Sequence, residues 1–218
     1  MKKNLNHWAI ALLICTCAGS TFAQNSPWSV HIGPVAVGLN LKTTPESPQG
    51  TPIPGANLFA SDGTTLGIEF GYDLSPNWTG RFTVGIPLKS TVTGAGTLAP
   101  LGTVGELSYG PAILTATYRL GKFGLFQPYV GAGAAYLIVF SSGDASVSNF
   151  KVKNAFGSAL QVGTDIDLGG GYRLFFDVKK VFVETEVSGT VPAFGGAPAY
   201  AKVRIDPLLI HAGLMYRF

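Results

Sequence analysis

Histidine and cysteine are the side chains best suited to acid–base or nucleophilic chemistry near neutral pH, and this 218-residue sequence holds three histidines and two cysteines. His7, Cys15 and Cys17 lie in an N-terminal segment that we expect to be removed, which leaves His31 and His211. A histidine acts as a general base only with a nucleophile within reach, and no serine or carboxylate stands beside either histidine at a suggestive spacing. The sequence therefore predicts that the protein is not an enzyme.

The N-terminal segment has the three parts of a cleaved signal peptide. A basic start is followed by an apolar stretch over residues 9–18, and small residues stand at Thr21 and Ala23, the two positions that a signal peptidase reads. We place the cut after Ala23, so that residues 1–23 are the signal peptide and residues 24–218 are one exported domain. The exported chain has no cysteine and therefore no disulfide.

The sequence has no recognisable binding motif for a metal, a phosphate or a nucleic acid. The histidines and carboxylates lack metal-ligand spacing, and Gly131–Gly133 and Gly169–Gly171 resemble phosphate loops only in composition, because no helix follows either run. Removal of Lys2 and Lys3 leaves 13 of the 15 basic residues against 12 acidic ones, so the exported chain has a net charge near +1. That balance offers no basic stripe for nucleic acid. We expect no cofactor, no metal and no nucleic-acid partner.

The composition indicates a membrane protein that does not cross by helices. Hydrophobic residues make up 46% of the chain, charged residues make up 12%, and the mean hydropathy is +0.30. Charged residues usually reach about 25% in soluble domains. Beyond the first 25 residues, the longest uncharged run of apolar and small residues is Val130–Phe140. A spanning helix needs about 20 such residues, so we expect strands.

Apolar residues alternate with polar or small ones over eight segments, which is the pattern of half-buried strands. From Leu66 to Tyr72, for example, every second residue is apolar. The apolar residues change phase at Gly33-Pro34 in the first segment and at Lys179-Lys180 in the seventh, where we expect β-bulges. The predicted strands are Val30–Leu41, Gly63–Ser75, Trp78–Lys89, Tyr109–Leu120, Val130–Phe140, Phe156–Leu168, Leu174–Val183 and Leu208–Phe218.

The connections between these strands alternate in length, which is the plan of an outer-membrane barrel. Short turns follow the second, fourth and sixth strands, and long loops follow the others, over residues 42–62, 90–108, 141–154 and 187–200. The sequence therefore predicts an all-β fold, an eight-stranded antiparallel transmembrane β-barrel of the outer-membrane type. Seven aromatic residues near the short-turn ends are expected to form a girdle at the membrane surface: Trp28, Tyr72, Trp78, Tyr118, Tyr129, Tyr172 and Tyr216.

The positions of the charged residues indicate which face of the strands points into the lumen of the barrel. An eight-stranded barrel has room inside only for its own side chains or for one small ligand. An Arg or Lys that faces lipid at the membrane midplane costs about 2–4 kcal/mol, and the charged residues of the clean strands lie opposite the apolar face. We therefore expect them to point into the lumen and to pair there. The predicted polar network of the lumen is Glu69, Arg81, Arg119, Asp165, Asp167, Asp177 and His211.

Five motifs follow one another along the chain: Gly110-Pro111 with Tyr118–Leu120, Gln127–Gly133, Gln161–Asp165, Val203–Pro207 and the terminal Tyr216–Phe218. In these motifs and their spacing the sequence resembles the OmpW family of small outer-membrane barrels. The resemblance implies residence among the lipids of the bacterial outer membrane and insertion by the assembly machinery through the C-terminal Phe218. It also implies a hydrophobic pocket in the lumen that passes small apolar solutes. Phe156 matches a family tryptophan that helps close this pocket, and its facing partner falls near Thr83.

Three functions stay open at this point. We expect a channel that passes small hydrophobic molecules and releases them sideways, because Pro87 and Pro111 lie in or beside strands and remove ladder donors. These prolines would otherwise only end strands or sit in bulges. The alternative is a surface receptor or structural barrel that acts through its long loops. A lipid-modifying barrel enzyme is the lesser alternative, since His31 and His211 lie on the first and last strands, which become neighbours when the barrel closes.

Overall fold

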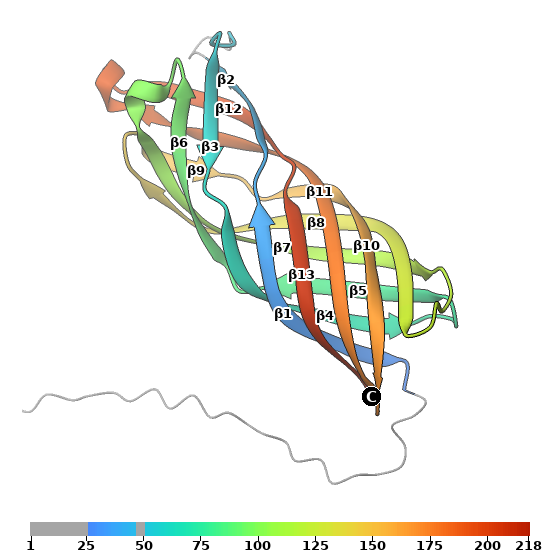
Figure 1. Ribbon diagram of the computed structural model, residues 1–218. Coiled ribbons are helices and arrows are strands. Elements are labelled where there is room, and N and C mark those ends of the chain that lie inside the picture. Colours follow the sequence, from blue (N-terminus) through green and yellow to red (C-terminus); the bar gives the residue numbers. More distant parts are fainter. Residues whose placement is uncertain (1–25, 47–50) are drawn as a thin grey trace, which may run out of the picture.

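The computed structural model describes residues 26–46 and 51–218, most of which lie in antiparallel strands (Figure 1). The predicted signal peptide, residues 1–23, lies outside the described residues. Two 3-10 turns, η1 (Ala99–Leu101) and η2 (Pro192–Phe194), connect strands, and no helix in the described part of the chain is long and apolar enough to span a bilayer. The strands are β1 (Trp28–Gly38), β2 (Leu41–Glu46), β3 (Ala56–Ala60), β4 (Gly63–Asp73), β5 (Trp78–Gly85), β6 (Leu88–Gly96), β7 (Thr103–Arg119), β8 (Phe126–Asp144), β9 (Ser148–Val152), β10 (Ala155–Gly169), β11 (Tyr172–Val191), β12 (Ala197–Ile205) and β13 (Leu208–Arg217).

Eight of these strands close into the predicted antiparallel barrel. Their order around the wall is β10, β8, β7, β5, β4, β1, β13 and β11, and β11 pairs with β10 to complete the circle. Tight connections join β4 to β5, β7 to β8 and β10 to β11 at one end of the barrel, here called the turn end. Gly169, Gly170 and Gly171 all have positive φ values, between 62° and 84°, which residues other than glycine rarely adopt.

The sequence predicts long loops at the opposite end of the barrel, here called the loop end, but the structure has strands there. These connections contain β2, β3, β6, β9 and β12, which pair with one another and with β7 and β11. The wall therefore continues as two sheets, β3–β6–β7–β8 and β9–β11–β12–β2, here called the extension (Figure 1). The inner faces of the two sheets pack against each other. The burial of their side chains stabilises strands in which apolar and polar residues alternate only weakly. The side chains buried between the sheets are Leu58, Val92, Val104, Val147, Phe150, Val191, Ala201 and Val203.

The two predicted bulges are absent. β1 passes through Gly33-Pro34 in unbroken register with β4 and β13, and β11 passes through Lys179-Lys180 in unbroken register with β10 and β13. Side-chain direction is therefore continuous along each strand, and His31 and Val35 are both buried on the inner face of β1. The apolar phase changes for another reason: the lumen lining turns from polar near the turn end to apolar toward the loop end.

Aromatic side chains ring the outer surface at the turn end, and the ring centroids of Trp28 and Tyr72 lie 4.8 Å apart. The prediction that Tyr129 belongs to the aromatic girdle is wrong. Tyr129 is fully buried in the lumen, because it stands on the same inward side of β8 as Ala135. The six aromatic residues that do lie on the outer surface are Trp28, Tyr72, Trp78, Tyr118, Tyr172 and Tyr216.

Candidate functional site

Polar side chains from six strands fill the turn-end half of the lumen and form a network, here called the polar plug. Glu69 lies near its centre and accepts hydrogen bonds from Arg81 at 2.8 Å, from Thr83 at 2.7 Å and from Gln161 at 3.3 Å. The Lys179 ammonium lies 2.8 Å from the same carboxylate. The plug consists of His31, Glu69, Arg81, Tyr129, Gln161, Asp165, Asp177 and Lys179.

Arg81 connects most of the plug. Its guanidinium also donates to Asp165 at 3.3 Å and to Thr117 at 3.2 Å, and it lies 3.9 Å from the centre of the Tyr129 ring. The Arg81 side chain is 1% exposed. A charge so far from water is costly unless it is paired and hydrogen-bonded. Two carboxylates and an aromatic face meet that requirement here.

Asp177 organises the other part of the plug. It accepts hydrogen bonds from Tyr129 at 2.9 Å and from Gln161 at 2.6 Å, and it also pairs with Lys179. Gly163 makes room for this arrangement, since a Cβ there would lie 2.4 Å from the Tyr129 hydroxyl oxygen. The charges of the plug bind one another. Such an arrangement is suited to closing a lumen rather than to holding a substrate.

Three residues expected in the lumen network lie outside the plug. Arg119 is buried but pairs with Asp73 at the rim of the turn end. Asp167 lies 3.8 Å from Lys122 and has a side chain that is 39% exposed. Asp167 has the inward parity of Asp165 but lies where β10 reaches the rim, so it pairs with Lys122 and not with the plug. His211 is buried beside the plug, with neither ring nitrogen in a hydrogen bond.

The two histidines do not meet. The Phe175 ring stands between them, with its centroid 5.0 Å from that of His31 and 4.6 Å from that of His211. His31 is held instead by Arg81, whose guanidinium lies 3.2 Å from its Nε2. Phe175 therefore separates the two side chains on which a catalytic pair would depend.

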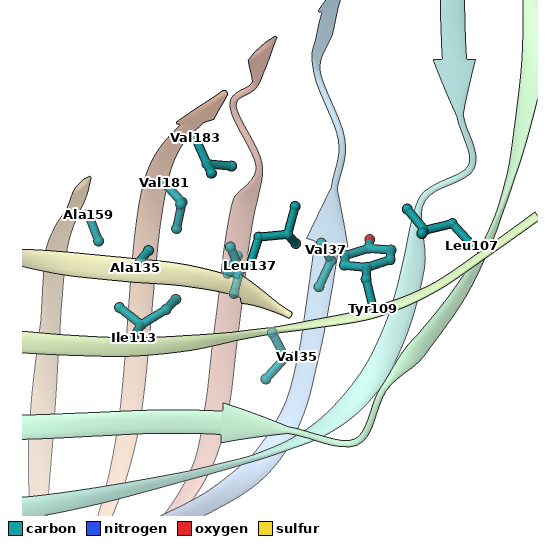
Figure 2. Close-up of a cluster of buried hydrophobic side chains, with 11 residues drawn as sticks. Val35, Val37, Leu107, Tyr109, Ile113, Ala135, Leu137, Ala159, Val181 and Val183 are labelled. Carbon is teal, nitrogen blue, oxygen red and sulfur yellow. The ribbon is translucent and has the colours of Figure 1, made fainter. Parts of the chain in front are cut away.

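Above the plug, toward the loop end, the lining of the lumen is apolar. Figure 2 shows these side chains pointing from the surrounding strands toward one another. A cavity of about 50 Å³ lies among them and reaches the extension, and we call it the apolar chamber. Ser90, Tyr109 and Thr185 are its lining residues with a polar group. The cluster in Figure 2 comprises Val35, Val37, Leu107, Tyr109, Ile113, Ala135, Leu137, Ala159, Val181, Val183 and Leu209.

A second apolar cavity lies inside the extension. Its volume is about 170 Å³, and we call it the outer cavity. Leu58, Phe150 and Val187 line both this cavity and the apolar chamber. The two spaces therefore adjoin, and an apolar lining continues from the loop end down to the plug.

The main-chain pairing of the barrel wall is interrupted beside the apolar chamber, and we call this interruption the wall gap. β5 pairs with β7 as far as Thr83 opposite Ile113, and pairing resumes where Leu88 of β6 lies opposite Tyr109. Between these points the chain stays with β4, to which it is paired as far as Gly85. The wall thus divides locally between β5 and β7.

A small cavity of about 30 Å³ lies at this gap, and we call it the wall cavity. Its lining includes Val37, Tyr109, Pro111 and Leu209, which also line the apolar chamber. Pro87 lies in the segment between β5 and β6. The two prolines that the sequence singles out therefore lie on the two sides of one gap.

Phe156 does not line the lumen, and the expectation that it helps close a lumen pocket is wrong. Its side chain is 78% exposed, and its ring lies 4.3 Å from that of Tyr136 on the outer surface. The physical reason is the alternation of β10, which places Phe156 on the same outward face as Leu160 and Val162. Thr83 does face the lumen, where its hydroxyl is bonded within the plug.

Sequence reasoning missed four residues of this site: Tyr109, Tyr129, Gln161 and Lys179. Two of them could have been found from alternation along the strands. Gln161 is an even number of residues from Asp165, and Lys179 is an even number from Asp177, so each points into the lumen with that carboxylate. Tyr109 likewise shares the inward parity of Ile113 on β7.

Comparisons with known proteins agree with this architecture. The OmpW family model matches residues 39–218. Dibenzothiophene metabolism operon protein PahQ from Pseudomonas aeruginosa is 36% identical over 201 residues, which are 92% of this chain and 93% of that protein. Outer membrane protein AlkL from Ectopseudomonas oleovorans is 34% identical over 169 residues, which are 78% of this chain and 72% of that protein.

Solved structures have the same fold. The crystal structure of OprG from Pseudomonas aeruginosa has a TM-score of 0.81 at 23% identity, over 88% of this chain and 95% of that chain. The solid-state NMR structure of AlkL in lipid bilayers has a TM-score of 0.71 at 29% identity, over 100% of this chain and 97% of that chain. The barrel lies in the bacterial outer membrane, where short turns face the periplasm and long connections face outward. The chain belongs to the OmpW family of outer-membrane proteins.

Proposed function

We propose that the protein is a channel rather than an enzyme, and that it passes small hydrophobic molecules from the cell exterior into the outer membrane. A solute would enter the outer cavity, move to the apolar chamber and leave sideways through the wall gap. The observation that carries this proposal is the shared lining of the apolar chamber and the wall cavity, directly above the polar plug.

The polar plug makes the straight path unfavourable. A hydrophobic solute that moved through it would separate Arg81 from Glu69 and Asp165 without offering new hydrogen bonds. Breaking one partner away from a buried ion pair costs about 3–5 kcal/mol. The apolar chamber imposes no such penalty, so the sideways path is preferred.

The prolines support an opening in the wall at this place. An unpaired backbone N–H in hydrocarbon costs several kcal/mol, so a seam in a membrane barrel is normally excluded. Pro87 and Pro111 have no N–H to leave unpaired. β7 continues through Pro111 to Arg119, so this proline does not merely end a strand.

The name of one relative suggests a class of solute. PahQ is called a dibenzothiophene metabolism operon protein, and dibenzothiophene is a flat, apolar molecule. The apolar chamber has the chemistry for such a solute, because its lining is almost wholly hydrocarbon. We therefore propose aromatic hydrocarbons and their sulfur analogues as the first candidates.

Uptake into vesicles tests the proposal. Full-length exported protein is placed in vesicles whose outer leaflet is lipopolysaccharide, and dibenzothiophene is compared with a polar molecule of similar size. Entry is read by energy transfer from the aromatic solute to an acceptor lipid in the inner leaflet, and the polar solute is measured by filtration. We expect faster entry of the apolar solute only. Entry no faster than in protein-free vesicles would exclude the transport function.

Tyr109 should set the size limit of the path, because it lies where the apolar chamber meets the wall cavity and is 6% exposed. Replacement by alanine, Tyr109→Ala, removes the ring from this junction. We expect uptake of a three-ring solute to rise by about tenfold, the scale of a pocket-size effect on selectivity, while a one-ring solute changes little. Tyr109→Phe keeps the ring and should behave like the unmodified protein. An equal rise for both solutes would contradict a size filter at Tyr109.

A further inference from the structure

The outer surface of the β9–β11–β12–β2 sheet carries a group of basic side chains. Lys202 and Arg204 of β12 point outward, since they alternate with the buried Ala201 and Val203. In the register of the sheet, Arg204 lies opposite Lys42 of β2. Five side chains form what we call the cationic face: Lys42, Lys151, Lys153, Lys202 and Arg204.

The cationic face is only partly neutralised by its own sheet. Four carboxylates lie on this surface or beside it, those of Glu46, Glu184, Glu186 and Asp206, and Asp206 lies 3.6 Å from the Arg204 guanidinium. Lys153 is bonded to Glu186 at 2.7 Å, which raises the pKa of Lys153 and lowers the pKa of Glu186, so both stay ionised. Within the described part of the chain, Lys42, Lys151 and Lys202 have no carboxylate within 4.0 Å. They are available to an anion from outside the protein.

The height of this face matches the head groups of the outer leaflet. Phe182 points outward two residues before Glu184 on β11, and Leu208, which is 40% exposed, lies opposite Lys180, four residues below the level of Arg204. These side chains mark the top of the lipid-facing apolar surface. Two residues along a strand rise about 7 Å, so Arg204, which lies opposite Glu184, stands about 7 Å above Phe182. Lys180 lies lower on the same face, and its ammonium donates a hydrogen bond to the Asp206 carbonyl.

The opposite side of the extension differs. Lys89 and Glu106 are the charged side chains that point outward from the described residues of β3, β6 and β7, so that surface has no net charge. The wall gap lies on this uncharged side, between β5 and β7. Around the barrel, the strands farthest from the gap are β13 and β11, which lead into the cationic face (Figure 1).

We propose that the cationic face binds the phosphate groups of lipid A, the membrane anchor of lipopolysaccharide. Lipid A places phosphate directly above its acyl chains, at the level of Lys42, Lys202 and Arg204. Basic side chains at a membrane surface attract anionic lipid heads, and arginine additionally forms paired hydrogen bonds with phosphate. Binding there holds phosphorylated lipid on one side of the barrel and leaves the side with the wall gap without bound phosphate. The proposal concerns lipid binding alone and stands whether or not solutes leave through the gap.

Lipid binding to paired charge variants tests this site. Detergent-solubilised full-length barrel is titrated with bisphosphorylated lipid A and with the same lipid after its phosphates are removed, and complexes are counted by native mass spectrometry. We expect Lys42→Gln with Lys202→Gln to weaken binding of the phosphorylated lipid by about tenfold. The phosphate-free lipid should bind weakly to both proteins.

A second pair controls for the loss of net charge. Lys89→Gln with Lys122→Gln removes the same charge from the neutral side and from a periplasmic turn, where the Lys122 side chain is 62% exposed. This control should bind phosphorylated lipid A like the unmodified protein. Equal loss in both pairs, or equal binding of the two lipids by the unmodified barrel, would overturn the proposal. Both variants change exposed side chains, and heat-dependent gel migration checks that each barrel has folded.

Discussion

Replacement of Arg81 by methionine should lower the free energy of unfolding by about 3–5 kcal/mol, the cost of leaving a buried ion without its partner. Arg81 lies 2.8 Å from Glu69 and 3.3 Å from Asp165. Without the guanidinium, only Lys179 remains to balance the carboxylates of the plug. Urea unfolding in lipid vesicles, followed by the fluorescence of Trp28 and Trp78, measures the change.

An exposed arginine provides the matched control for this prediction. The Arg204 side chain is 57% exposed, and Arg204→Met should change the free energy of unfolding by no more than about 0.5 kcal/mol. The double variant Arg81→Met with Glu69→Gln should recover part of the loss, because the carboxylate that Arg81→Met leaves unpaired is removed as well. If Arg81→Met is as stable as Arg204→Met, the plug does not stabilise the barrel.

Replacement of Gly110 by phenylalanine should reduce uptake of hydrophobic solutes by tenfold or more, about 1.4 kcal/mol or above in the barrier. Gly110 lines the wall cavity. A Cβ at Gly110 would lie 3.5 Å from the Phe140 ring and 3.9 Å from both Gly85 and Pro87, which is ordinary van der Waals contact. A Cβ at this position therefore meets no clash, and the ring of a phenylalanine would extend from it beside the wall cavity. The vesicle assay with dibenzothiophene measures the effect.

Gly80 offers the comparison for this block. Gly80 lies on β5, one of the two strands that border the gap, but near the turn end, and a Cβ there would lie 3.9 Å from Leu74. Gly80→Phe adds the same ring to the wall away from the gap and should leave uptake unchanged. If Gly110→Phe transports as well as Gly80→Phe, solutes do not leave between β5 and β7. Transport by the unmodified protein would still stand in that case, with another exit.

The outer surface of this barrel could be predicted from the sequence because lipid imposes one simple rule on it. Residues such as Leu66, Phe70 and Tyr72 face the same solvent, so strict alternation is enough to find their strand and its direction. The lumen follows no single rule. Its lining is polar at His31 and apolar at Val35, although both side chains point inward.

This change of lining explains the wrongly predicted bulges. At Gly33-Pro34 the apolar residues pass from the outward to the inward side of an unbroken strand, and the same happens at Lys179-Lys180. A β-bulge and a change of lumen lining both appear in a sequence as a shift in the phase of the apolar residues. Only the pairing with neighbouring strands separates them, because a bulge shifts the register and a change of lining does not.

The error at Phe156 has a different origin. Its proposed role came from the family resemblance, whereas alternation along the strand puts it with Leu160 and Val162 on the lipid side. The extension could not be predicted because its strands gain their burial from a sheet that is distant in sequence. Val92 and Val203, for example, pack in the same cluster.

The polar plug has a consequence for the cell that carries this protein. A barrel with a water-filled bore would let ions, nutrients and antibiotics diffuse through every copy, so its abundance would be limited by leakage. In this barrel the polar plug closes the lumen, and its cations Arg81 and Lys179, each 1% exposed, are already paired with carboxylates. Many copies of such a closed barrel can therefore lie in an outer membrane that still excludes water-soluble toxins.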